Sequence, residues 1–317
     1  LDTDPAADVV YFDEDKISAD GTTPCDPYFK PDWSPEHLLS INYLMHSVIR
    51  RSTIEAVGGL NSQYDGAQDW DLALRLAEHG VRPRHIPRVL YHWRKLPGSA
   101  ASDAFAKPWA MAAQAPCIKA HLERRGFMGV EVETPAFGVL QPRWTGQGSR
   151  VSIVIPTRDR AAMLRTCLTS LLTITTYQHY EILLVDTGSV EPQTARLYEE
   201  LASEPRIRLL RFDGEFNYSG VNNWAAAQAT GDMLVFLNND VEVLHADWLD
   251  ELTRWAELKE IGCVGAKLLY PDGTIQHAGL VMGLEGHASQ IFRHEAGAHH
   301  WSCFGSPDFY RNHLAIT

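Results

Sequence analysis

The feature that most constrains the fold is a regular alternation of strand and helix patterns between residues 151 and 237. Val151–Ile155 is a continuous apolar run, as expected for a parallel strand that is covered on both faces. Further strands are predicted over 181–185, 207–212 and 233–237, and helices over 161–172, 192–201 and 219–229. Short connections in such an alternation imply right-handed crossovers. We therefore predict an α/β fold with a mostly parallel sheet flanked by helices.

Polar residues follow three of these strands. The runs are Pro156-Thr157-Arg158, Asp186-Thr187-Gly188-Ser189 and Asn238-Asn239-Asp240. Open α/β sheets bind ligands at the carboxyl ends of their strands, so these side chains predict a site for a nucleotide and a metal ion. No G-x-G-x-x-G follows the first strand, so a dehydrogenase-type dinucleotide site is not indicated.

The bulk composition excludes several classes of protein. The 317 residues allow one large or two ordinary domains, and the net charge of -12 argues against nucleic acid as a partner. The five cysteines are scattered without a C-x-x-C pair, which favours a reducing compartment. No apolar run approaches about 18 residues and no signal-peptide pattern is present, so we expect a cytoplasmic location. Because the chain begins at Leu1 and stops at Thr317, we also expect it to be a fragment.

The three polar runs resemble the nucleotide-binding half of a family 2 glycosyltransferase with the GT-A fold, as in rhamnosyltransferases and other polysaccharide-building enzymes. In that family the first strand ends in a Pro-Thr-like turn, an Asp follows the second, and a DxD-type motif ends the fourth. Pro156-Thr157, Asp186 and Asn238-Asn239-Asp240 stand at these positions. The resemblance implies a Rossmann-like GT-A sheet, a UDP- or dTDP-linked sugar as donor, and Mn²⁺ or Mg²⁺.

The resemblance also assigns donor-binding residues. Asp186 matches the residue that contacts uracil or thymine, and Phe216–Asn223 matches a segment that lines the donor pocket. Helix capping is the alternative role of the asparagines, with Asn217 or Ser219 as the cap. The full predicted set is Pro156, Thr157, Arg158, Asp186, Ser189, Asn217, Asn222, Asn223, Asn238 and Asn239.

Two segments match the DxD-type position, which holds the metal. Tyr11–Asp15 can be superposed on Phe236–Asp240, so the predicted metal ligands are Asp240 in the second half of the chain and Asp13 and Asp15 in the first. Asn238 at the first position can bind a ribose but carries no charge. The alternative for each acidic run is a solvated turn after a strand.

This internal repeat predicts two partial modules. Residues 1–97 resemble the acceptor side of a first GT-A module, 98–150 form a helical connector and linker, and 151–317 are the nucleotide-binding half of a second module. In the first part we predict strands over 9–12, 48–51 and 89–93 and helices over 52–57, 68–80 and from Ser34. The Ala-rich stretch 102–126 is predicted to be helical and broken near Pro108 and Pro116.

Gln68-Asp69-Trp70-Asp71 matches the family's catalytic segment, which usually reads Glu-Asp at its start. Asp69 is the predicted general base, which would take the proton of the acceptor hydroxyl. The replacement of Glu by Gln68 removes one carboxylate. The alternative is that Asp69 is an acid at a helix start, which the helix dipole favours.

Histidines gather in two other places. Those near the C-terminus have no standard zinc spacing and are interpreted as polar loop or acceptor-facing residues: His277, His287, His294, His299 and His300. Tyr91-His92-Trp93-Arg94 is either near the donor diphosphate, as the family implies, or a satisfied strand end.

The predicted function is metal-assisted, inverting transfer of a sugar from a nucleotide-diphosphate sugar to a glycan or lipid-linked acceptor. The family implies a bacterial-type surface polysaccharide, and peripheral membrane association through segments outside this chain. Three alternatives stay open: a non-catalytic sugar-nucleotide or glycan-binding module, two halves that complement each other as in a circular permutation, and a nucleotidyltransferase. The duplicated DxD argues against the second, and the lack of glycine in Thr157–Arg160 argues against the third.

Overall fold

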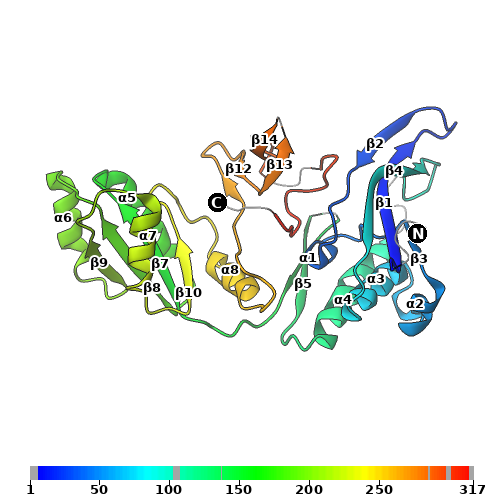
Figure 1. The fold of residues 1–317 in the computed structure, drawn as a ribbon, viewed down its shortest axis with the longest axis horizontal. Coiled ribbons are helices and arrows are strands. Elements are labelled where there is room, and N and C mark those ends of the chain that lie inside the picture. Colours follow the sequence, from blue (N-terminus) through cyan, green and yellow to red (C-terminus); the bar gives the residue numbers. More distant parts are fainter. Residues whose placement is uncertain (1–5, 103–107, 137, 285, 298–300, 314–317) are drawn as a thin grey trace. The chain divides into compact units, whose positions relative to one another are not determined.

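The computed structural model describes residues 6–102, 108–136, 138–284, 286–297 and 301–313. The chain forms two compact units, one of residues 146–264 and one that combines residues 1–145 with 265–317 (Figure 1). Among the described residues, no helix is both long enough and apolar enough to cross a membrane.

The unit of residues 146–264 contains the predicted strand and helix alternation. Its strands form one parallel sheet in the order β10-β7-β8-β9. The elements are β7 (Val151–Thr157), α5 (Ala161–Ile174), β8 (Tyr180–Asp186), α6 (Pro192–Leu201), β9 (Ile207–Arg211), α7 (Tyr218–Ala226), β10 (Met233–Phe236) and α8 (Trp248–Ala256). The prediction of an α/β fold with a parallel sheet flanked by helices is confirmed.

Helices cover both faces of this sheet. On one face Ile153 and Ile155 of β7 pack with Leu164 and Leu168 of α5, and the same cluster includes Leu197 of α6. On the other face, residues of β7 and β8 pack against Val221 and Ala225 of α7: Val154, Leu183 and Val185. Because both faces are covered, β7 and β8 are buried along nearly their whole length, which explains their continuous apolar sequence.

The strand order places a topological switch point beside β7. From β7 the chain moves outward through β8 to β9, and it then returns to the other side of β7 with β10. The connection from β7 to β8 runs through α5 on one face, whereas the connection from β9 to β10 runs through α7 on the other face. A crevice opens at the carboxyl ends of the strands at such a switch point. The ends of β7, β8 and β10 are the three places where the sequence carries its polar runs.

At the amino ends of the strands, a buried carboxylate joins neighbouring strands. Glu181, at the start of β8, accepts hydrogen bonds from Ser152 Oγ at 2.7 Å and Thr230 Oγ1 at 2.7 Å. Arg208 on β9 pairs with it at 2.9 Å. Burial raises the pKa of Glu181, but Arg208 and the hydroxyl donors outweigh burial and lower it to about 2. This network fixes the strand starts of β7, β8 and β9.

The second unit is built around β1 (Val9–Ile17). β1 pairs in parallel with β4 (Arg84–Arg94) and antiparallel with β2 (Pro24–Tyr28) and β3 (Ser47–Ile49). The remaining elements of residues 1–145 are α1 (Pro35–Leu38), α2 (Arg51–Ala56), the 3-10 helix η1 (Ser62–Tyr64), α3 (Gln68–Glu78), α4 (Pro108–Arg124), β5 (Glu131–Ala136) and β6 (Val139–Arg143). Ser34 caps α1 as predicted, because its side chain accepts a hydrogen bond from His37 N.

Two predictions for this unit are wrong. The first strand does not end at Phe12 before an acidic turn, since β1 runs through Asp13 and Asp15 to Ile17. It continues because β4 pairs with it along its length and supplies partners for both acids. Pro116 does not break the helix, because α4 is continuous from Pro108 to Arg124.

Residues 265–317 belong to the same unit as residues 1–145. They contribute β11 (Leu268–Leu269) paired with β12 (Ile275–His277), and β13 (Leu280–Leu284) paired with β14 (His287–Gln290). Phe29 N donates to Cys303 O at 2.8 Å, and the buried His37 donates from Nδ1 to Tyr310 O at 2.8 Å. The two compact units do not test the predicted modules. The module boundaries 1–97, 98–150 and 151–317 therefore stay a prediction.

Candidate functional site

A pocket of about 230 Å³ lies at the carboxyl ends of β7 and β10. Its lining includes five residues of the predicted donor set: Pro156, Thr157, Arg158, Asn238 and Asn239. The other lining residues are Thr187, Phe216 and Tyr218. The strand order brings these segments together, because β10 returns beside β7 at the switch point.

Hydrogen bonds tie the three strand ends to one another. Asn239 Nδ2 donates to Thr157 Oγ1 at 2.9 Å. Thr187 donates to Thr157 O from its backbone N at 2.9 Å and from Oγ1 at 3.0 Å. Thr157 is buried and lies between the other two residues. The pocket floor is therefore formed before any ligand arrives, which is the usual state of a binding site for small molecules.

Asp186 and Ser189 lie beside this floor in the loop after β8. The buried Asp186 accepts a hydrogen bond at Oδ1 from Ser189 N at 2.8 Å. Ser189 Oγ in turn accepts from Asp159 N at 2.8 Å. The loops that follow β7 and β8 thus hold each other in place.

The turn after β7 adopts an unusual backbone conformation. Asp159 and Arg160 both have positive φ, 54° and 58°, although neither is glycine. The turn is held because Asp159 Oδ1 accepts hydrogen bonds from Glu191 N and Val190 N, each at 2.8 Å, and these bonds lower the pKa of Asp159. Left-handed residues of this kind persist only where surrounding contacts fix them. The consequence is that Arg158 is presented at the pocket.

The three predicted asparagines of α7 occupy different surroundings. Asn217 caps the helix, with Oδ1 accepting from Gly220 N at 2.8 Å, so the capping interpretation holds for this residue. Asn222 is buried and donates from Nδ2 to Tyr218 O at 2.9 Å. Asn223 is exposed on α7. Contact of these side chains with a donor stays a prediction.

Asp240, the predicted metal ligand of this unit, is exposed and directly follows the pocket residue Asn239. Burial, together with the nearby Asp240 charge, raises the pKa of the Cys167 thiol to about 11. Within the described ranges, no three His, Cys, Asp or Glu side chains are grouped to hold a metal ion. Mg²⁺ commonly binds through one or two carboxylates together with substrate phosphates, so a single exposed carboxylate fits that mode.

Asp13 and Asp15 are buried side chains of β1 in the other unit. Asp13 Oδ1 accepts from Lys30 N at 2.9 Å and from His85 Nε2 at 3.0 Å. His92 Nδ1 donates to Asp15 Oδ1 at 2.5 Å. The interpretation as a solvated turn is therefore wrong for this pair, because both carboxylates are paired inside a strand. Their role as metal ligands stays a prediction.

Asp69, the predicted base, is the second residue of α3. Its Oδ1 accepts a hydrogen bond from Trp70 N at 2.9 Å. Burial raises the pKa of Asp69 above its ordinary value, and this effect outweighs the lowering by the Trp70 amide and by His46. A carboxylate with a raised pKa is a better proton acceptor, which suits a general base.

His46 belongs to a group of residues that sequence reasoning missed. Glu14 Oε2 accepts from Lys30 Nζ at 2.7 Å and from His46 Nδ1 at 2.6 Å. The His46 ring stacks on Tyr91, with centroids 3.8 Å apart, and lies edge-on to Trp93. Only Tyr91 and Trp93 were noted in the sequence; Lys30 carries no local signal, since its burial depends on tertiary packing.

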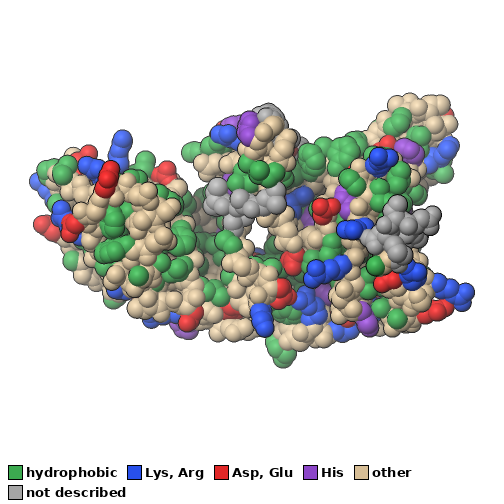
Figure 2. All heavy atoms as spheres, viewed as in Figure 1, with side chains coloured by type: hydrophobic (Ala, Val, Ile, Leu, Met, Phe, Trp, Pro, Cys, Tyr) green, Lys and Arg blue, Asp and Glu red, His purple; other side chains and the backbone are tan. Residues whose placement is uncertain are grey.

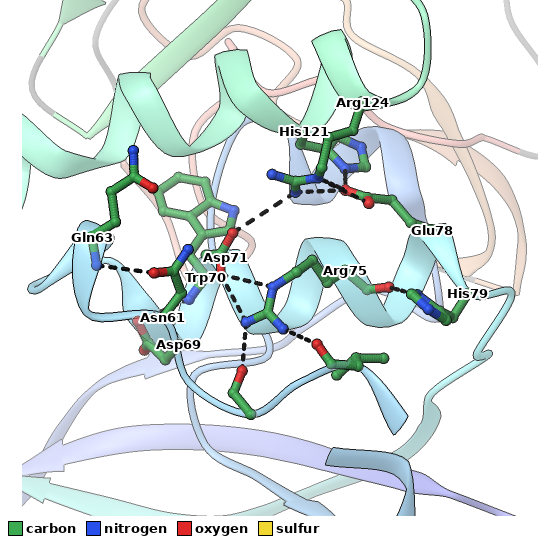
Figure 3. A network of polar contacts seen from close by, with 12 residues as sticks. Asn61, Gln63, Asp69, Trp70, Asp71, Arg75, Glu78, His79, His121 and Arg124 are labelled. Carbon is green, nitrogen blue, oxygen red and sulfur yellow. Dashed lines mark hydrogen bonds and ion pairs between the residues drawn. The ribbon is translucent and has the colours of Figure 1, made fainter. Parts of the chain in front are cut away.

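A polar network fixes the helix that carries Asp69 (Figure 3). Arg75 pairs with the buried Asp71 at 2.8 Å and donates to Gly59 O at 2.6 Å. Glu78 accepts from His121 at 2.6 Å and from Arg124 on α4, again at 2.6 Å. Asp69 takes no part in these contacts. The network therefore fixes the helix that carries Asp69, but none of its cations pairs with the Asp69 carboxylate.

The turn before α3 explains why Gln68 can stand at this position. Gly66 has φ +95°, and a Cβ there would lie 2.5 Å from Ala110 Cα. Gln68 Oε1 accepts a hydrogen bond from Gly66 N at 2.5 Å. Gln68 thus stabilises the glycine turn on which the start of α4 packs, a role that needs an acceptor oxygen but no charge.

The predicted histidine loop is only partly described. His277 is buried, while His287 and His294 are exposed, and His294 stacks on Tyr270 with centroids 5.1 Å apart. His299 and His300 lie outside the described residues.

Comparison with known proteins identifies the segment that carries the pocket. Residues 152–299 match the family described as "Glycosyl transferase family 2". This segment is therefore similar to members of that family. The match begins within β7 and includes every residue that lines the pocket.

Two curated relatives match nearly the whole chain. The O-antigen biosynthesis protein RfbC of Myxococcus xanthus is 43% identical over 315 residues, which are 99% of this chain and 24% of that protein. The uncharacterized protein y4gI of Sinorhizobium fredii is 43% identical over 327 residues, covering 100% of this chain and 35% of that protein. The chain therefore spans about a quarter to a third of the length of these relatives.

Solved structures show weaker similarity. A mannosyltransferase from Pyrobaculum calidifontis, in complex with GDP-Man and Mn²⁺, has a TM-score of 0.34 and 21% identity, covering 38% of each chain. GalNAc-T7, with UDP, GalNAc and Mn²⁺, has a TM-score of 0.34 and 18% identity, covering 36% of this chain and 22% of its own.

Proposed function

We propose that this chain is part of a glycosyltransferase that moves a sugar from a nucleotide-diphosphate sugar to a glycan or lipid-linked acceptor. The pocket at the ends of β7 and β10 carries the proposal, because it unites residues from three strand ends in a family 2 segment. The similarity to an O-antigen biosynthesis protein supports a surface polysaccharide as the product. UDP or dTDP is the proposed nucleotide of the donor.

The donor would bind with its nucleoside in the pocket and its diphosphate toward Asp240. Asp186 would contact the base, and Thr157 and Asn239 would line the nucleoside site. Arg158, exposed at the pocket, offers a positive charge to the phosphates. A divalent cation bound at Asp240 would act as a Lewis acid for the departing diphosphate.

Asp69 is proposed as the general base of the acceptor side. The carboxylate would accept the proton of the acceptor hydroxyl while that oxygen forms its bond to the anomeric carbon. The bond from this carbon to the diphosphate breaks on the opposite face, so the configuration inverts. The raised pKa of Asp69 and its place outside the Arg75 network support this role.

The module arrangement is part of the proposal. Residues 1–97 would be the acceptor side of one module with Asp13 and Asp15 as metal ligands, 98–150 a connector, and 151–317 the donor side of the next. The size of the relatives supports this arrangement, since the chain matches only 24% of one and 35% of the other.

A thermal-shift panel tests the donor site. A ligand that binds only the folded state raises the melting temperature, so UDP or dTDP with Mn²⁺ is expected to stabilise the chain, whereas NAD is not. Asp240→Asn should remove the Mn²⁺-dependent part of the shift. Asp232→Asn is the matched control, because Asp232 is an exposed acid before the start of β10. Absence of a shift with UDP, dTDP and GDP would contradict the proposed donor site.

A non-catalytic binding module is the second candidate. One observation favours it: Gln68 stands where the family usually has Glu, and its oxygen serves the Gly66 turn. In that case Asp69→Asn would leave both nucleotide binding and the biological effect of the full-length protein unchanged. Loss of polysaccharide formation with retained nucleotide binding would exclude this candidate.

A further inference from the structure

Two aromatic side chains at the pocket have no role in the core of their unit. Phe216 is 57% exposed and Tyr218 is 50% exposed, yet both line the pocket. Nearby Phe212 and Trp224 instead pack against each other, with centroids 5.5 Å apart, and against the core cluster beneath α7. Two large aromatic rings are therefore exposed at the pocket, whereas the neighbouring rings of Phe212 and Trp224 pack against the core.

The backbone that carries these rings is fixed. Asn217, between them, caps α7 through its bond to Gly220 N. Asn222 is buried and donates to Tyr218 O at 2.9 Å, which anchors the first turn of the helix. Rings on a fixed backbone lose little freedom when a ligand binds, so their contact area contributes to affinity at low entropic cost.

The pocket suits only part of a nucleotide sugar. Its volume of about 230 Å³ is below the roughly 300–1,000 Å³ of sites that enclose whole drug-sized ligands. The polar side of the lining comes from Thr157, Asn238 and Asn239, and the aromatic side from Phe216 and Tyr218. A flat heteroaromatic ring with polar edges matches this division.

We propose that Phe216 and Tyr218 stack on the nucleobase of the donor. This inference rests on the proposed function and adds the residues that hold the base by its faces. Stacking tolerates any base, because every base has a π face, so the two rings would supply affinity. The choice among bases would then depend on polar contacts at the edges of the base.

Isothermal titration with UDP, UMP and pyrophosphate tests the proposal on the whole chain. Phe216→Ala and Tyr218→Ala are each expected to raise the dissociation constants for UDP and UMP roughly tenfold, and to leave that for pyrophosphate unchanged. Phe216→Trp and Tyr218→Phe should keep near wild-type affinity, because they keep a stacking surface. Leu209→Ala is the control, since Leu209 is a 47% exposed apolar residue of β9 away from the pocket.

The outcomes separate the inference from the function on which it rests. If wild type binds UDP and the two alanine variants bind it equally well, the rings do not stack on the base, and the proposed function stands without them. Equal weakening of UDP and pyrophosphate would also overturn the stacking role. If wild type binds none of UDP, dTDP and GDP, the donor site itself is refuted and the stacking proposal falls with it.

Discussion

At the scale of single residues, the proposed chemistry depends on the different surroundings of two acids of α3, Asp69 and Asp71. Asp71 is fully buried and pairs with Arg75, so it serves the helix. Asp69 is only partly buried, and burial raises its pKa by more than the Trp70 amide and His46 lower it. The sequence presents both as acids at a helix start, and only their surroundings distinguish a structural carboxylate from a proton acceptor.

Asp69→Asn tests this distinction in the full-length protein. Loss of a general base is expected to lower the rate of sugar transfer roughly 10²–10⁴-fold. Affinity for UDP should not change, because the nucleotide site is built from other residues. Asp65→Asn is the control, since Asp65 is exposed three residues before α3. Equal transfer rates for Asp69→Asn and wild type would show that Asp69 is not the base.

The pH dependence follows from the direction of the Asp69 pKa. The base must be deprotonated to accept a proton, so the rate should fall as pH decreases through the pKa of Asp69. Because burial raises this pKa above 3.8, the acid limb should lie above the pH expected for a solvent-exposed Asp. A pH–rate profile measures it, and an acid limb at or below 3.8 would contradict the account.

At the scale of helices and strands, local patterns predict the elements of residues 151–237 well. The central strands β7 and β8 are buried on both faces and the helices begin after short loops, so local sequence and tertiary packing agree. The prediction fails where a tertiary partner decides. β1 extends through Asp13 and Asp15 because His85 and His92 of β4 pair with them. The segment Phe216–Asn223 was expected at the donor pocket, but its asparagines were singled out and not its rings, because nothing local separates the exposed Phe216 from the packed Phe212.

Glu78 links α3 to α4 and should stabilise the unit that contains them. Burial raises its pKa, but the bonds from His121 and Arg124 outweigh burial and lower it to about 2. Glu78→Gln is expected to cost about 2 kcal/mol of unfolding free energy near neutral pH. A carboxylate with a depressed pKa contributes its stability above its unfolded pKa and loses it as pH falls toward about 2. The difference between variant and wild type should therefore shrink between pH 4.5 and 2 in denaturant unfolding, and a constant difference would contradict the assignment.

Pro116 inside α4 carries a cost that the fold tolerates. A proline within a helix removes one backbone hydrogen bond and clashes with the preceding turn, at about 3 kcal/mol. Pro116 is exposed, so Pro116→Ala loses no core contact and should raise the melting temperature. Lys119→Ala, at an exposed position of the same helix, is the control. A lower melting temperature for Pro116→Ala would mean that the proline shapes the helix in a way that the fold requires.

At the scale of the whole molecule, the two compact units predict separable responses. The tail of residues 265–317 joins residues 1–145, while the parallel sheet of residues 146–264 has its own core. This partition could not be read from the sequence, because the tail follows the sheet without a composition break.

Calorimetry should show that UDP with Mn²⁺ stabilises the unit of residues 146–264. Glu181→Gln, which removes the buried carboxylate of that unit, should weaken it and leave the effect of Glu78→Gln unchanged. Strong non-additivity of Glu181→Gln and Glu78→Gln would contradict two independent units.

The most direct test of the central claim is a crystal structure of this chain with UDP and Mn²⁺. The account predicts electron density for the uridine in the pocket lined by Thr157 and Asn239, with the diphosphate toward Asp240. Density for UDP at any other place, with this pocket empty at saturating nucleotide, would contradict it.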